Sequence, residues 1–76
     1  MMFKSVTFEV VGDQRLHCES CELRVKRLLK GVPGVGQVRA NSHEQRIEVL
    51  FDSALIDPNA IAVRLSTAGY ETELAQ

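Results

Sequence analysis

The sequence predicts an α+β fold in which two helices pack on one face of a four-stranded antiparallel sheet. Some stretches alternate apolar and polar residues, as strands do, and two others repeat apolar residues every three or four positions, as helices do. These stretches follow one another as β-α-β-β-α-β, and right-handed crossovers then place both helices on the same side of the sheet. The chain has 76 residues without linker, repeat or low-complexity tract, so we expect a single domain, 1–76.

The first strand is predicted at residues 3–11 and the first helix at 19–30. In the strand, apolar residues at every second position are expected to face the core; they are Val6, Phe8 and Val10. Residues 12–15 are polar and predict a loop. The helix carries an apolar stripe at spacings of four, three and four residues, formed by Cys21, Val25, Leu28 and Val32. Gly31 is expected to end this helix as its C-cap.

Three further strands are predicted at 35–40, 46–51 and 70–74, with a turn at 41–45 between the first two. Residues expected to point inward from the first two are Val38, Ala40, Ile47, Val49 and Phe51. With these strands, the order of elements is that of the ferredoxin-like βαββαβ sandwich.

The second helix is expected to begin after Asp57, a good N-cap residue that precedes a proline at the first helical position. It is expected to stop near Gly69. Its inward side chains are predicted to be Ile61, Leu65 and Ala68.

The only two cysteines, Cys18 and Cys21, are the most informative residues for function. They lie where the first helix begins, and the helix N-terminus favours thiolate, the form that binds metal. Two sulfurs from one short loop suit Cu(I), a soft ion that accepts few ligands, whereas Zn²⁺ would lack two of its usual four. The spacing therefore predicts a soft-metal site at Cys18 and Cys21.

Composition excludes several other classes of function. The net charge of −1 gives no support for a nucleic-acid partner, because phosphate binding requires a clear excess of Lys and Arg. No apolar run reaches the length of a transmembrane helix, so no membrane insertion is expected. Polar residues interrupt the N-terminal stretch, which therefore does not have the pattern of a secretory signal. We expect a cytoplasmic, reducing setting, in which free thiols persist.

Several segments together resemble a known family. They are Cys18-Glu19-Ser20-Cys21, Val25, Leu28, Leu29, Val32-Pro33-Gly34-Val35, Ile47-Glu48-Val49 and Ala68-Gly69-Tyr70. With them the chain resembles a heavy-metal-associated (HMA) domain, a family that includes copper chaperones and the N-terminal domains of metal-pumping P-type ATPases. The resemblance implies that Cys18 and Cys21 carry the metal and that Tyr70 lies near it, as in bacterial members. Leu16 stands where the family usually has a methionine that packs under the loop, and three residues separate it from Gly12.

The resemblance implies a Cu(I) carrier rather than an enzyme. Such a carrier passes its ion by thiolate exchange to the Cys-x-x-Cys site of a partner, for example a metal-transporting P-type ATPase. Without metal we expect a monomer, and with metal a dimer could form through shared ions. A start at Met1 favours a stand-alone carrier, although an ATPase domain would have the same sequence features.

Two alternatives stay open, namely a Zn²⁺, Cd²⁺ or Hg²⁺ module of the same fold and a thiol-disulfide oxidoreductase. His17 adjoins Cys18 and could add a nitrogen ligand, but its side chain is expected to point away from the ion. His43, in the predicted turn, is expected as a surface residue at the cysteine end of the sheet, roughly 10 Å away. Basic residues on the first helix also suit docking on an acidic partner.

Overall fold

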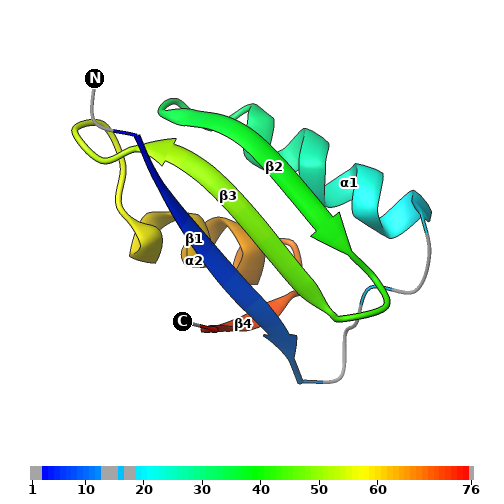
Figure 1. Ribbon diagram of the computed structural model, residues 1–76. Coiled ribbons are helices and arrows are strands. Elements are labelled where there is room, and N and C mark those ends of the chain that lie inside the picture. Colours follow the sequence, from blue (N-terminus) through cyan, green and yellow to red (C-terminus); the bar gives the residue numbers. More distant parts are fainter. Residues whose placement is uncertain (1–2, 13–15, 17–18, 76) are drawn as a thin grey trace.

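The structure, a computed structural model, describes residues 3–12, 16 and 19–75. Over these residues the elements are β1 (Phe3–Val11), α1 (Glu19–Lys30), β2 (Val35–Asn41), β3 (Arg46–Asp52), α2 (Pro58–Thr67) and β4 (Glu71–Leu74). The strands form one antiparallel sheet in the order β2-β3-β1-β4, and both helices lie on the same face of it (Figure 1). The predicted ferredoxin-like fold is therefore confirmed. Within the described part of the chain, neither helix is long and apolar enough to cross a membrane.

The central strands β1 and β3 provide the floor of the core. They pair from Phe3–Asp52 to Glu9–Arg46, so their inward side chains lie in adjacent rows. Six side chains from these two strands are at most 6% exposed, as alternation predicted: Val6, Phe8, Val10, Ile47, Val49 and Phe51. From the neighbouring edge strand β2, Val38 is buried and Ala40 is half-buried.

Helix α1 has the predicted bounds, but its buried stripe differs from the prediction. Val25 and Leu29 are completely buried, whereas Leu28, predicted to face inward, is only partly buried against the core. Both leucines follow Val25 on the same broad apolar arc, at three and four positions, so the sequence pattern alone does not decide which one is central. The helix ends at Lys30, directly before Gly31, as predicted. The glycine with a left-handed backbone comes later in the same turn, at Gly34 with φ 96°.

Helix α2 begins as predicted. The Asp57 side chain accepts a hydrogen bond from the backbone N–H of Ala60 at 2.9 Å, and Pro58 occupies the first helical position. Both features satisfy or remove donors that a helix start leaves unpaired. Ile61 and Leu65 are completely buried, as predicted, so this helix is packed on the sheet through one narrow stripe.

The end of α2 departs from the prediction at two positions. The helix ends at Thr67, so Ala68 lies in the following turn and is exposed, although it was predicted to face inward. Gly69 then reverses the chain with φ 99°. Tyr70, predicted as the first residue of the last strand, precedes β4 and is buried instead. The turn thereby directs the Tyr70 ring into the core.

Candidate metal centre

Cys21 is the one predicted metal ligand that the structure describes. It lies in the first turn of α1, half-buried against the core, and its thiol is free. Cys18 and His17 lie outside the described residues. Among the residues that are described, no three His, Cys, Asp or Glu side chains are grouped so that they could hold an ion. The roles of Cys18, Cys21 and His17 as ligands therefore stay predictions.

Tyr70 lies beside Cys21, although 49 positions separate them in the sequence. Its side chain is only 3% exposed, and this burial raises the pKa of its hydroxyl. The charge of Cys21 and a hydrogen bond with Cys21 raise that pKa further, while Arg24 opposes the rise. The phenol is therefore protonated at neutral pH and can donate its O–H to a thiolate sulfur. The resemblance led us to expect Tyr70 near the cysteines; a role in shielding the metal stays a prediction.

Leu16 is buried in the core, two positions before Cys18. Its side chain is 2% exposed and belongs to the same core cluster as Tyr70. This burial agrees with the expectation that Leu16 packs where the family's methionine usually does. Its backbone is also held: the Leu16 N–H donates to Oε1 of Gln45 at 2.8 Å, and its carbonyl accepts from Nε2 of Gln45 at 2.6 Å.

The β2–β3 turn contacts the start of α1, next to Cys21. The Ser42 N–H donates to Oε2 of Glu22 at 2.7 Å. Hydrogen bonds from the Ser42 backbone and hydroxyl lower the pKa of Glu22 most. Desolvation raises this pKa by less, and the positive charges of Lys26 and His43 lower it by smaller amounts still. His43 is exposed in the β2–β3 turn, and Figure 1 shows this turn at the end of the sheet where α1 begins, as predicted. Its coordination of metal stays untested.

Gln45 and Glu22 were not identified from the sequence as neighbours of the site. Their partners lie 29 and 20 positions away, so no local pattern could pair them. The only signal was weak: a polar turn after an edge strand, at the end of the sheet where the cysteines were expected.

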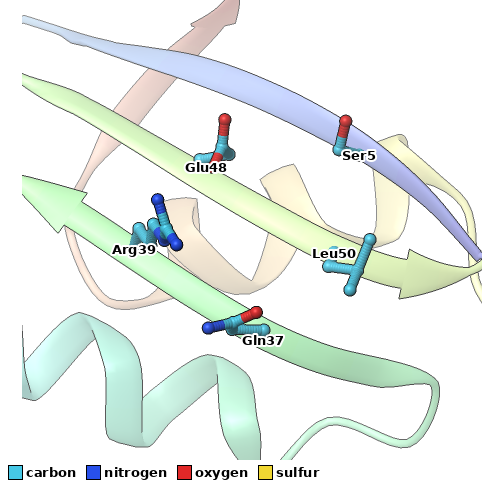
Figure 2. A pocket seen from close by; sticks show the side chains of 5 residues that line it. All are labelled: Ser5, Gln37, Arg39, Glu48 and Leu50. Carbon is cyan, nitrogen blue, oxygen red and sulfur yellow. The ribbon is translucent and has the colours of Figure 1, made fainter.

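A shallow groove of about 210 Å³ lies elsewhere, on the sheet face opposite the helices. Figure 2 shows the side chains that line it, which come from β1, β2 and β3: Ser5, Gln37, Arg39, Glu48 and Leu50. None of them is a predicted site residue. The groove is therefore separate from the candidate metal centre.

Comparisons with known proteins agree with the fold. Residues 7–71 match the heavy-metal-associated domain family. Copper-transporting ATPase 2 of Rhizobium meliloti (strain 1021) is 37% identical over 66 residues, which are 87% of this chain and 8% of the ATPase. Oxidized MerP from Ralstonia metallidurans CH34 is 27% identical, with a TM-score of 0.85 over 97% of this chain and 99% of that chain. The N-terminal domain of ZntA in the Zn(II)-form is 25% identical, with a TM-score of 0.77 over 95% of this chain and 92% of that chain.

These likenesses differ in what they cover. The chain spans between 7% and 38% of the length of the curated relatives it matches, so it corresponds to one part of each. The two solved domains, in contrast, match it over nearly their whole length. The family match runs from within β1 to the first residue of β4 and includes Leu16, Cys21 and Tyr70. The chain belongs to the heavy-metal-associated domain family.

Proposed function

We propose that residues 1–76 form one domain that binds a single Cu(I) ion between the thiolates of Cys18 and Cys21 and passes it to a partner. The observation that carries this proposal is the environment of Cys21, a half-buried free thiol in the first turn of a helix. A ligand at this position lies near unpaired backbone N–H groups and the positive end of the helix dipole. The protonated Tyr70 hydroxyl adds a hydrogen-bond donor for the sulfur.

The donor set favours a soft ion. Thiolates prefer Cu(I) among the physiological metals, and two of them satisfy an ion that accepts low coordination. A copper-transporting ATPase that is 37% identical supports copper as the cargo. The ZntA domain in its Zn(II)-form supports Zn²⁺ as the alternative cargo. Zn²⁺ would need two further ligands from water, His17 or a partner.

Transfer follows from incomplete coordination. A partner's thiolate attacks the bound ion, a three-coordinate species forms, and one domain sulfur then leaves; each thiol that binds metal first releases its proton. Cys18 is proposed to exchange first, while Cys21, fixed in α1, holds the ion. No substrate bond is made or broken, so the proposed activity is carriage and not catalysis. Delivery would occur in the cytoplasm, and without metal the domain would be a monomer.

The partner is proposed to be a metal-transporting P-type ATPase or another Cys-x-x-Cys protein. Leu23, on α1, is 51% exposed and shares a surface hollow with Ser20, Arg24 and Arg27, close to Cys21 in the sequence. An apolar side chain flanked by guanidinium groups suits a partner surface with an apolar centre and acidic surroundings. Contact there would bring the two thiol pairs together.

Anaerobic competition against bicinchoninate tests the metal assignment. We expect the wild type to retain one Cu(I) per chain, and Cys18→Ser or Cys21→Ser each to lose tight binding. His17→Ala is the matched control and should change affinity only modestly. Loss of copper with retention of zinc would identify zinc as the cargo, and failure to bind any soft ion would refute the proposal. Insulin reduction with dithiothreitol should show no turnover; appreciable turnover would indicate an oxidoreductase.

A further inference from the structure

We propose that the β2–β3 turn is a clamp for the metal-binding stretch 16–22, and that Gln45 and Glu22 are its positioning residues. The inference rests on the proposed function, because it concerns how firmly the two cysteines are held around an ion. It assigns a role to side chains that neither the cysteine motif nor the family resemblance singled out.

Both N–H donors of the Gln45 side-chain amide are used, and its oxygen accepts one hydrogen bond. Its Oε1 accepts from the Leu16 N–H at 2.8 Å, and its Nε2 donates to the carbonyls of Leu16 and Ser42, each at 2.6 Å. The amide therefore pairs with both backbone groups of Leu16, much as a neighbouring strand would. Its backbone carbonyl also accepts from the Val10 N–H at 2.7 Å. One residue thus joins the end of β1, the turn and the start of the metal-binding stretch.

The same turn is attached to the other end of the stretch. The Ser42 N–H donates to Oε2 of Glu22 at 2.7 Å, and Glu22 directly follows Cys21. Leu16 and Glu22 therefore bracket both cysteines, and each is bonded to the turn. Both bonds span at least 20 positions, so they hold Leu16 and Glu22 against the turn and do not act only on local conformation.

The backbone of Gln45 gives independent support. Its φ of 55° lies in the left-handed region, which glycine adopts at lower cost than any other residue. In the described part of the chain, the other residues with positive φ are Gly12, Gly34 and Gly69. A strained conformation persists where the surroundings require it. At this position glycine would relieve the strain but could not make the hydrogen bonds of the glutamine amide.

The clamp also offers a reason for the unusual spacing between Gly12 and Leu16, before the cysteines. Three residues separate Gly12 from Leu16, where the resembling family has a direct Gly-Met step. A longer connection has more conformations to lose when the ligands gather around an ion. Holding Leu16 from the turn removes part of that cost before metal arrives, so the bound state should be tighter and release slower.

The test compares three Gln45 variants. Gln45→Gly removes the amide and relieves the backbone strain, Gln45→Ala removes the amide alone, and Gln45→Glu retains an acceptor but loses the donor. Gln37→Ala is the matched control, since Gln37 is exposed on β2 in the groove of Figure 2, away from the cysteine motif. Three quantities are measured: hydrogen exchange of the Leu16 amide in the metal-free protein, the rate of Cu(I) release to bicinchoninate, and unfolding by urea.

We expect faster exchange at Leu16 in Gln45→Gly and Gln45→Ala, which lose the acceptor of its N–H, and little change there in Gln45→Glu, which keeps it. Cu(I) release should be about three- to tenfold faster in all three variants, the range that loss of a hydrogen bond implies. Gln37→Ala should match the wild type. For the other attachment, Glu22→Ala should accelerate release, whereas Glu22→Gln, which keeps an acceptor oxygen, should restore most of the wild-type rate.

Gln45→Gly separates a clamp from a merely structural role. If it changed only the urea midpoint and left Leu16 exchange and Cu(I) release at wild-type values, the clamp would be refuted while the proposed function stood. A wild type that bound no soft metal would refute the proposed function itself, and the inference with it. The affinity of the wild type for Cu(I) therefore tests the proposed function, and the ratio of the variant's Cu(I) release rate to that of the wild type tests the clamp.

Discussion

Replacement of Leu16 by alanine should destabilise the metal-free domain strongly. The substitution removes three carbon groups from a side chain that is 2% exposed, which at about 0.8 kcal/mol each is about 2.4 kcal/mol of lost transfer free energy. The cavity left in the core raises the expected loss to about 3–4 kcal/mol. A domain of this size has only about 4–11 kcal/mol in total. The midpoint of thermal unfolding should therefore fall by more than about 10 °C.

Urea unfolding followed by far-ultraviolet circular dichroism, under reducing conditions, measures this loss. Leu23→Ala is the matched control, because the same chemical change at a half-exposed position on α1 should alter the free energy of unfolding by less than about 0.5 kcal/mol. Leu16→Met, a volume-conserving change, should cost less than about 1.5 kcal/mol. A Leu16→Ala variant as stable as Leu23→Ala would show that Leu16 does not anchor the stretch in the core, and the packing argument would fail.

Three further predictions address single interactions. Tyr70 is the only tyrosine and the chain has no tryptophan, so absorbance at 295 nm should follow the ionisation of Tyr70. Cys21→Ser should lower the raised pKa of Tyr70, while burial should keep that pKa above its ordinary value. An unchanged titration curve would show that Tyr70 and Cys21 do not interact. Because folding lowers the pKa of Glu22, its carboxylate stabilises the fold fully above the unfolded pKa near 4.5 and progressively less as pH falls through the folded pKa. The difference in free energy of unfolding by urea between wild type and Glu22→Gln should therefore shrink on acidification. A difference that stayed constant with pH would contradict this sign. Asp57→Ala should cost about 1 kcal/mol in the same assay, whereas no loss would mean that the bond to Ala60 contributes nothing net.

Local patterns in the sequence determined the elements of the fold and predicted the chemistry of the site. Alternation with period two predicted the inward rows of β1 and β3, and Asp57-Pro58 predicted the start of α2. The spacing of Cys18 and Cys21 at a helix start indicated soft-metal chemistry without any coordinates. The predictions of the strands and of the helix start are confirmed because side-chain direction and capping depend on residues within a few positions of one another.

Only the tertiary structure decided what depends on how the elements lie against one another. The packing of α1 on the sheet made Leu29 central in place of Leu28, and the turn after α2 exposed Ala68 and buried Tyr70 beside Cys21. The attachment of Gln45 to Leu16 was equally invisible in the sequence. A hydrogen bond across 29 positions has no local pattern, because the energy that forms it depends on packing that only the assembled sheet and helices supply.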